Sequence, residues 1–325
     1  MSKISQHSQP GIPDISVIIP MYNSENDISF CLAKLRQQEL SNLEIICVDD
    51  GSTDHTAEKV LDVARVDSRI RLFRQKNAGP GAARNLGIAH AHGHYIAFLD
   101  ADDEYPSNET LKELYDKAVQ SKFSIVGGSI IVRQADGRLD DTFDGEFDGQ
   151  QFHTSGPMQY SDYQYDFGFY RFIYSRELIQ KNNTRFPTLR YFEDPVFMVN
   201  AFWCAGFFYA IDKPTYLYNF THHNVNRKTK ANQVIDIFRG IGYNLRFSKE
   251  NNLPRLHWYT ISRFNMFYNQ AVRNGRCYTF RVELAIRAAC RHMSLTLACR
   301  WKPIDVPFYS GLTRLLIHLK HAFNP

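Results

Sequence analysis

The sequence predicts an α/β fold, a mostly parallel sheet flanked by helices, followed by a mainly helical C-terminal region. Two observations predict it: strand, turn and helix patterns alternate through the first 130 residues, and the later sequence reads as helices rich in Arg, Lys, Tyr and Phe. The chain has 325 residues, enough for one large α/β domain with an appendage. We expect a flexible tail at 1–13, the α/β domain at 14–225 and the helical region at 226–325.

Four apolar, β-branched runs have the length and composition of buried strands: 15–20, 43–48, 70–74 and 95–99. Helical patterns follow them at 27–38, at 56–64, from Ala82 onward and at 111–120. Right-handed crossovers join such units into a parallel sheet, so the carboxyl ends of the strands meet at one edge. Ligands bind at that edge in open α/β sheets.

Polar turns follow each of these strands, and they contain Tyr22, Asp50 and the run Asp100-Ala101-Asp102-Asp103. Arg84 is expected in the first turn of the helix that opens at Ala82, after the third strand. Taken singly, such residues are typical of helix caps and tight turns. Together at one edge they supply a ring for a base to stack on, carboxylates for a base or ribose, and an arginine for phosphate. Asp100 and Asp102 can also share one hard cation through oxygen ligands. The sequence therefore predicts a metal-and-nucleotide site.

Other classes of protein are disfavoured. A dinucleotide fingerprint is absent because Arg84 stands where its third glycine would be, and there is no Walker loop. A net charge of +4 is too mild to indicate nucleic-acid binding. The six cysteines form no Cys-x-x-Cys pair, and the polar amino terminus lacks the apolar core of a secretory signal, so we expect a cytoplasmic protein. The apolar window 196–211 is too short for a bilayer and predicts a buried helix followed by a strand.

Four ordered motifs carry a family resemblance: ISVIIPMYNSE, EIICVDDGSTD, NAGPGAARNLGI and GHYIAFLDADDEY. They resemble the amino-terminal half of family 2 glycosyltransferases, which have the Rossmann-like GT-A fold. The match is specific over 14–130 and looser to about 225. It implies an inverting enzyme that uses a nucleoside-diphosphate sugar.

The resemblance implies nucleotide contacts for six strand-end residues: Pro20, Tyr22, Asp50, Arg84, Asp100 and Ala101. Pro20 and Tyr22 would flank the nucleobase, and Asp50 would pair with it. Asp100 and Asp102 would form the D-x-D motif, with Asp102 as the direct Mn²⁺ or Mg²⁺ ligand and Asp100 facing ribose and metal. We expect Asp103 to cap the following segment.

Sugar transfer also needs a base that takes the proton of the acceptor hydroxyl. Glu193 and Asp194 directly precede Pro195, a spacing that suits a helix start with Asp194 as cap and Pro195 as first helical residue. An Asp-Pro pair before a helix is commonly only a cap. The resemblance places the base of the family at a Glu-Asp pair in this part of the chain. We therefore expect Asp194 to be the base and Glu193 to orient the acceptor or the helix.

Three later stretches leave alternatives open. The aromatic residues of 151–174 pack against the sheet or line an acceptor groove. His222 and His223 read as a surface loop, with one of them reaching the metal or diphosphate as the alternative, and nearby Arg227, Lys228 and Lys230 could close over the diphosphate. The basic, aromatic C-terminal helices form a solvated bundle or lie on an anionic membrane surface.

The sequence thus predicts an inverting, metal-dependent glycosyltransferase. It would move a sugar from a UDP-linked donor to a hydroxyl of a glycan or lipid-linked acceptor in bacterial surface-polysaccharide or lipopolysaccharide synthesis. The expected cofactor is Mn²⁺ or Mg²⁺, and the expected location is the cytoplasm or the inner face of the membrane. The alternatives are a nucleotidyltransferase and a non-catalytic glycan- or partner-binding protein of the same fold.

Overall fold

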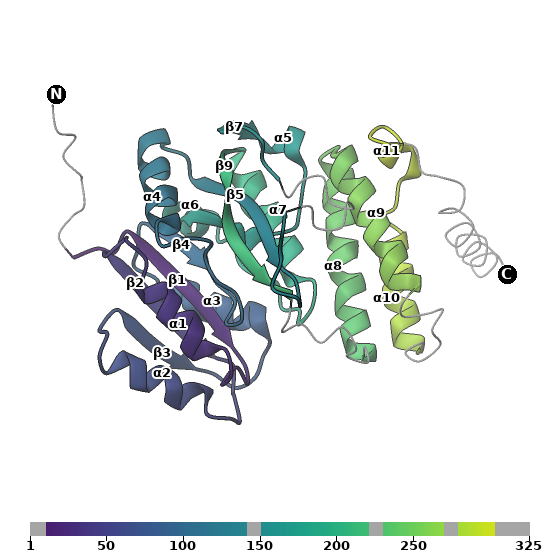
Figure 1. Ribbon diagram of the computed structural model, residues 1–325. Helices are drawn as coiled ribbons and strands as arrows, with labels where there is room; N and C mark the ends of the chain where they lie inside the picture. The colour runs from purple at the N-terminus through teal and green to yellow at the C-terminus, as the bar shows by residue number, and fades with distance from the viewer. Residues whose placement is uncertain (1–10, 142–150, 221–229, 270–278, 303–325) are drawn as a thin grey trace. The chain divides into compact units, whose positions relative to one another are not determined.

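The chain forms two compact units, shown in Figure 1 as a computed structural model that describes residues 11–141, 151–220, 230–269 and 279–302. The first unit consists of 1–160, 168–188 and 200–224, and the second of 161–167, 189–199 and 225–325. The segments 161–167 and 189–199 therefore cluster with the C-terminal helices, although the sequence pattern groups them with the α/β domain.

A nine-stranded sheet forms the centre of the first unit, in the order β3-β2-β1-β4-β8-β5-β9-β7, with β6 paired to β5. The strands are β1 (Ile15–Met21), β2 (Leu43–Asp49), β3 (Ile70–Arg74), β4 (Tyr95–Phe98), β5 (Ile125–Arg133), β6 (Leu139–Asp140), β7 (Gly156–Gln159), β8 (Phe172–Ser175) and β9 (Phe207–Asn219). The first four strands pair in parallel, whereas β8 runs antiparallel to β4 and to β5. The four predicted strands are confirmed, and their carboxyl ends lie along one edge.

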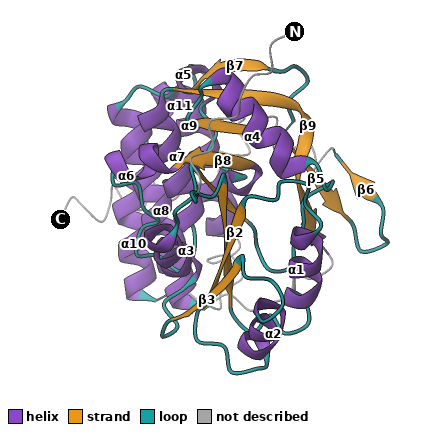
Figure 2. Cartoon of the chain, turned by 90° about the vertical axis from the view of Figure 1, so that its left-hand side faces the viewer, coloured by secondary structure: helices purple, strands orange, loops and turns teal. Residues whose placement is uncertain are grey.

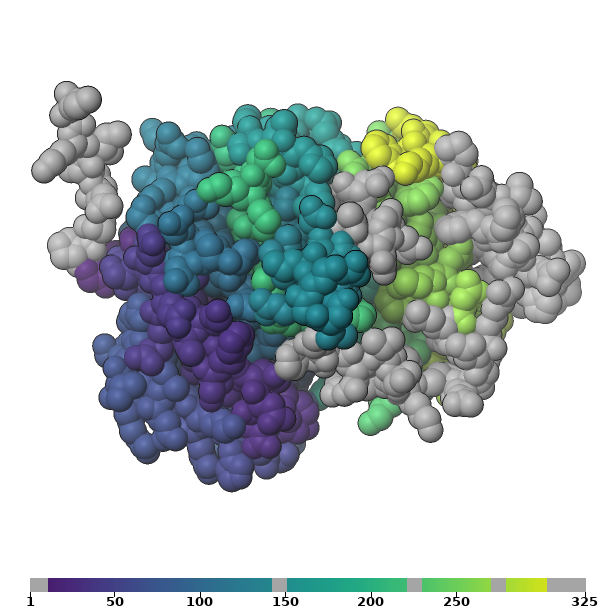
Figure 3. Space-filling view, in the orientation of Figure 1, coloured from purple at the N-terminus to yellow at the C-terminus, as the bar shows by residue number. Residues whose placement is uncertain are grey.

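Helices cover both faces of this sheet, with α1 and α2 on one face and α3 on the other (Figure 2). The helical segments up to α6 are α1 (Ile28–Arg36), α2 (Thr56–Ala64), α3 (Pro80–His90), α4 (Thr110–Ser121), α5 (Tyr160–Tyr163), the 3₁₀ turn η1 (Phe169–Arg171) and α6 (Arg176–Lys181). In the space-filling view, the purple and blue elements of the first unit form one continuous surface (Figure 3).

The start of α3 differs from the prediction. The helix begins at Pro80, two residues before Ala82. Proline fits the first helical turn because no partner is needed there for its missing N–H, and Gly79 takes a φ of +99°, which favours glycine. Arg84 therefore lies one residue beyond the first turn of the helix.

The aromatic residues between 151 and 174 are mainly packing residues. Of the nine aromatic side chains in this stretch, only Phe167 is partly exposed, and the other eight are buried: Phe152, Tyr160, Tyr163, Tyr165, Phe169, Tyr170, Phe172 and Tyr174. In the first unit, the rings of Phe172 and Phe202 meet edge to face at 4.9 Å. The burial of these eight side chains supports packing against the sheet rather than the lining of an acceptor groove.

The second unit is mainly helical, as the sequence predicts. Its helices are α8 (Ala231–Glu250), α9 (Pro254–Tyr268), α10 (Phe280–Cys290) and α11 (Leu295–Ala298), and α7 (Glu193–Ala205) begins in it. Buried apolar residues of α8, α9 and α10 form one core together with Phe192. No helix in the described ranges is both long enough and apolar enough to cross a bilayer.

The expected helix followed by a strand over 196–211 is confirmed by α7 and β9. The predicted helix start is wrong by two residues, since α7 begins at Glu193 rather than Pro195 and includes Asp194 in its first turn. The predictions for His222, His223, Arg227 and Lys228, and for the C-terminal stretch from 303 onward, lie outside the described residues.

Candidate active site

The loops that follow β1, β2 and β4 begin side by side at the carboxyl edge of the sheet. Backbone hydrogen bonds continue across this edge: the Asp50 amide donates to the Met21 carbonyl at 2.8 Å and the Leu99 amide to the Ile18 carbonyl at 3.1 Å. The sheet thus brings the turns that carry Tyr22, Asp50 and Asp100 to one edge, as the sequence predicts.

The two loops after β1 and β2 are tied to each other by short polar side chains. The Asn23 amide donates to Ser52 Oγ at 3.0 Å, and Asn23 Oδ1 accepts from the Thr53 amide at 2.9 Å. Asn23 takes a φ of +51°, a conformation that asparagine tolerates better than most residues. Beside this fixed backbone the Tyr22 side chain is 51% exposed, whereas Pro20 is only partly exposed. The Tyr22 side chain is therefore accessible to a ligand at this edge.

Asp50 is buried and holds the loop that starts α3. Its carboxylate accepts three hydrogen bonds, from Gln75 Nε2 at 2.7 Å and from the amides of Ala78 and Gly79 at 2.8 Å each. A carboxylate has about four acceptor positions, so one remains for a further donor. Its pairing with a nucleobase stays a prediction, and this structural role was not apparent from the sequence.

Arg84 binds Asp100. Its Nη2 lies 2.8 Å from Asp100 Oδ1, and the arginine is only 5% exposed. The guanidinium also lies over the rings of Phe169 and Phe186, at 4.9 and 5.4 Å. The ion pair and the two rings hold the Arg84 guanidinium toward the D-x-D turn.

Asp103 anchors the D-x-D turn to β9. Its carboxylate accepts from the Tyr216 hydroxyl at 2.7 Å and from the Asn219 amide at 2.8 Å, and Asn219 Nδ2 donates to the Asp102 carbonyl at 2.7 Å. Burial, together with the charges of Asp102 and Asp100, raises the pKa of Asp103 well above its usual value. The expectation that Asp103 only caps the next segment missed this link, because its partners lie more than 110 residues away along the chain.

The residues of this turn fit a divalent cation. Asp100 and Asp102 are partly exposed, with buried Ala101 between them, and carboxylate oxygens are the ligands that Mg²⁺ and Mn²⁺ prefer. The turn concentrates three carboxylates, of which only Asp103 is enclosed. Within the described ranges, no three side chains of His, Cys, Asp or Glu are grouped to hold a metal.

Glu193 and Asp194 belong to the second unit, where they open α7. Glu193 is 5% exposed, while Asp194 is partly exposed. The preceding residue, Phe192, takes a φ of +66°, a conformation that is rare for an aromatic side chain. Strained backbone of this kind clusters at functional sites. The greater exposure suits the base role expected of Asp194, and the burial of Glu193 suits a role in orienting the helix.

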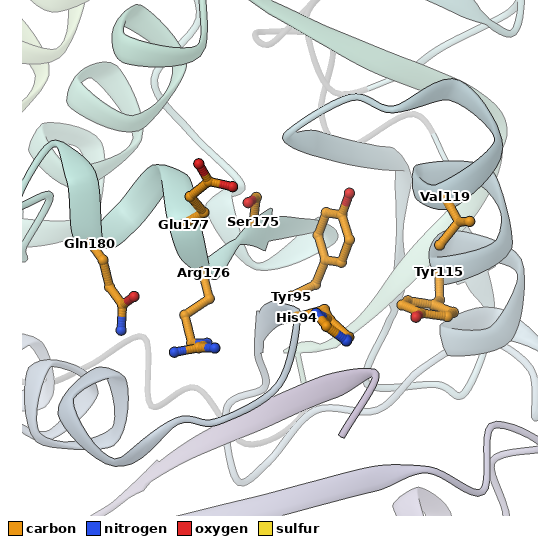
Figure 4. A pocket seen from close by; sticks show the side chains of 8 residues that line it. All are labelled: His94, Tyr95, Tyr115, Val119, Ser175, Arg176, Glu177 and Gln180. Carbon is orange, nitrogen blue, oxygen red and sulfur yellow. The ribbon is translucent and has the colours of Figure 1, made fainter. Parts of the chain in front are cut away.

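A separate pocket of about 510 Å³ lies at the opposite edge of the sheet, where β4 begins. Figure 4 shows side chains from three places around it: His94 and Tyr95 at the start of β4, Tyr115 and Val119 on α4, and Arg176 and Gln180 on α6. None of the predicted site residues lines this pocket.

Known proteins resemble both the sequence and the fold. Over 213 residues the chain is 35% identical to the uncharacterized glycosyltransferase EpsJ of Bacillus subtilis, a match that covers 64% of this chain and 61% of EpsJ. It is 25% identical over 313 residues to the succinoglycan biosynthesis protein ExoO of Rhizobium meliloti, with 91% and 88% of the two chains covered. The chain thus spans about three fifths of the length of EpsJ.

The fold resembles that of residues 1–349 of S. aureus TarS, solved in complex with UDP, with a TM-score of 0.65 at 20% identity over 87% of this chain and 82% of that one. This likeness confirms the expected GT-A class of fold. The family model described as glycosyl transferase family 2 matches residues 16–210, more than half of the sequence. The chain therefore belongs to glycosyl transferase family 2.

Proposed function

We propose that this protein transfers a sugar from a nucleoside diphosphate, most directly UDP, to a hydroxyl of a glycan or lipid-linked acceptor in surface-polysaccharide synthesis. The observation that carries the proposal is the Asp100-Ala101-Asp102 turn, held at the carboxyl edge of the sheet by Arg84 and by the anchor on Asp103. The carboxylates of this turn are suited to bind a metal ion, and the guanidinium of Arg84 beside them is suited to attract a diphosphate.

The related proteins support the choice of donor. TarS was solved with UDP and with UDP-GlcNAc, and the mannosyltransferase PcManGT of Pyrobaculum calidifontis with GDP-Man and Mn²⁺. The name of ExoO connects that relative to succinoglycan biosynthesis. By analogy we assign to this chain a sugar-nucleotide donor, a divalent cation and a role in polysaccharide assembly.

The proposed mechanism assigns separate roles to the residues that bind the nucleobase, hold the metal and accept the proton. The exposed ring of Tyr22, beside Pro20, stacks on the nucleobase. The Asp50 carboxylate accepts a hydrogen bond from the nucleobase. Asp102, with Asp100, holds the cation, which when bound supplies positive charge against the leaving diphosphate. Asp194 takes the proton of the acceptor hydroxyl as it attacks opposite the diphosphate, so the anomeric configuration inverts.

We also propose that residues 14–225 form the transferase domain and that 226–325 support it. Peripheral contact with the inner face of the membrane belongs to the same proposal, since it would bring the enzyme to a lipid-linked acceptor. A flotation assay with anionic vesicles of phosphatidylglycerol and phosphatidylethanolamine tests this contact, and a protein that stays at the bottom of the gradient contradicts it.

A panel of sugar nucleotides tests the activity. The protein is incubated with UDP-, GDP- and TDP-linked sugars and Mn²⁺, and nucleoside diphosphate release is measured with and without EDTA. We expect release from a UDP-sugar that stops when EDTA removes the metal. Pyrophosphate release from a mixture of a nucleoside triphosphate and a sugar phosphate would instead indicate a nucleotidyltransferase. If no sugar nucleotide is turned over, even when glycan or lipid extracts are added as acceptors, the protein would be a binding protein.

A further inference from the structure

The C-terminal helices meet the candidate base through Phe192. This side chain, 9% exposed, packs into the core formed by α8, α9 and α10, directly before Glu193 and Asp194. Its fit against α8 depends on Gly240: a Cβ at 240 would lie 2.7 Å from Phe192 Cδ1 and 2.9 Å from its carbonyl oxygen. The absence of a side chain at 240 thus allows the left-handed backbone of Phe192 to lie against the helix.

Arg263 of α9 also contacts Phe192. It is 6% exposed, its guanidinium lies 5.8 Å from the centre of the Phe192 ring, and its Nη2 is paired with the fully buried Asp166. Asp166 also accepts from Asn244 Nδ2 of α8 at 2.8 Å. Two other guanidinium nitrogens, Nε and Nη1, are buried and make no hydrogen bond within the described structure. A buried arginine with spare donors is costly, which indicates a task beyond its pair with Asp166.

The charged groups around Arg263 come from three segments. Burial opposes its charge, yet Asp166 and Tyr165 from residues 161–167, with Asp194 from α7, raise the pKa of the guanidinium above its ordinary value. From α8 the neutral Asn244 faces Asp166, and Asp236 accepts from the Arg190 amide at 3.0 Å. Electrostatic interaction is mutual, so Arg263 favours the ionised form of Asp194.

We propose that Arg263 is the positioning residue for the Glu193–Asp194 pair, holding the first turn of α7 through its contact with the Phe192 ring. The inference rests on the proposed function, in which Asp194 is the base. It gives the C-terminal helices a part in activating the acceptor, in addition to any part in stability.

Kinetics of the full chain test this role. Variants are assayed with the UDP-sugar that the wild type turns over, giving kcat, KM and the pH profile of kcat, while UDP affinity with Mn²⁺ is measured by calorimetry. For Arg263→Met we expect kcat about tenfold lower and the acid limb of the profile about one unit higher in pH, because Asp194 loses a stabilising positive charge. UDP affinity should stay within about twofold of wild type, since the residues proposed to bind UDP lie in the first unit. Arg263→Lys keeps the charge and should restore the acid limb.

A double variant guards against simple unfolding. Arg263→Met alone leaves Asp166 buried without its pair, so Arg263→Met with Asp166→Asn removes both charges. We expect this protein to fold, with kcat still about tenfold low because Phe192 has lost its guanidinium contact, and with a smaller shift of the acid limb. A folded double variant with wild-type kcat and profile would overturn the inference.

Two matched controls lie on the same helices. Arg255 of α9 also stacks on aromatic rings, at 4.7 Å from Trp301 and 5.7 Å from Tyr259, and Arg255→Met should leave kcat and the pH profile unchanged. On α8, Gly240→Ala should lower kcat about tenfold without moving the acid limb. At Gly242 a Cβ would lie 3.3 Å from Ala289 Cα of α10 and away from Phe192, so Gly242→Ala should change kcat much less. Equal effects of the two glycine substitutions would contradict the proposed contact.

Asp194→Asn, measured in the same assays, separates the two claims. If Asp194→Asn keeps normal turnover, the base assignment itself fails. If it is inactive while Arg263→Met and the double variant Arg263→Met with Asp166→Asn behave as wild type, only the positioning role fails.

Discussion

The D-x-D edge of the first unit and the Glu193–Asp194 corner of the second are supported in different ways. At the edge, the loops after β1 and β2 hold each other through hydrogen bonds between residues about 30 positions apart, within one pair of βα units. At the corner, the partner pairs span nearly 100 positions, from Asp166 to Arg263. Local sequence motifs therefore describe the edge well, whereas the corner depends on the assembled helices.

The largest expected effect concerns the base at the corner. We predict that Asp194→Asn lowers the transfer rate by about 10² to 10⁴-fold, because the amide cannot accept the acceptor proton. UDP affinity in Mn²⁺ should stay near that of the wild type, since the edge is untouched. Single-turnover rates and calorimetry give the two values, and Glu177→Gln, an exposed carboxylate on α6, serves as the control.

The next effect concerns the stability of the helical unit. His257 is fully buried, with Nε2 accepting from the Ser294 amide at 2.8 Å and Nδ1 2.7 Å from Ser248 Oγ. Burial, and then the charge of Lys249, lower the pKa of His257 to about 4. Since the unfolded state takes up the proton near pH 6.5, stability is complete above that pH and is lost as the pH falls toward 4, by about 3 kcal/mol in all.

Urea unfolding at pH 7, 5.5 and 4.5 measures this loss. Tryptophan fluorescence is a suitable probe because Trp258 and Trp301 both belong to the second unit. In His257→Gln, the free energy of unfolding should change little with pH between 6.5 and 4. Substitution of the exposed His55 in the first unit should leave the pH dependence of the wild type unchanged. An unchanged slope in His257→Gln would show that other groups carry the acid sensitivity.

Much of the fold and of the edge could be predicted from the sequence. The strand runs are short, β-branched and followed by polar turns, so they specify β1 to β4, and parallel pairing then places Tyr22, Asp50 and Asp100 together. The second tasks of these residues could not be read in this way. Asp50 holds the α3 loop through backbone amides, a contact that no side-chain motif records.

The anchors from distant segments were also beyond the sequence patterns. In the sequence, Asp103 looks like one more carboxylate of the turn. Only the structure shows that Tyr216 and Asn219 of β9 donate hydrogen bonds to it. Arg263 reads as one of many basic residues on a helix, and only the packing of Phe192 shows what it faces. The same holds for Gly240, because the sequence does not distinguish it from Gly242 on the same helix, and only the position of the Phe192 ring shows why a side chain is excluded there.

The most direct test of the account is whether Asp102 makes UDP binding depend on metal. Thermal unfolding is measured with UDP alone, Mn²⁺ alone and both, for the wild type and for Asp102→Asn. A ligand that binds only the folded protein at about 100 times its Kd adds about 2.7 kcal/mol of stability, so we predict a clear rise in Tm with UDP and Mn²⁺ together in the wild type. Asp102→Asn should lose most of that rise. An equal rise in both proteins, or a rise with UDP that is the same without metal, would contradict the account.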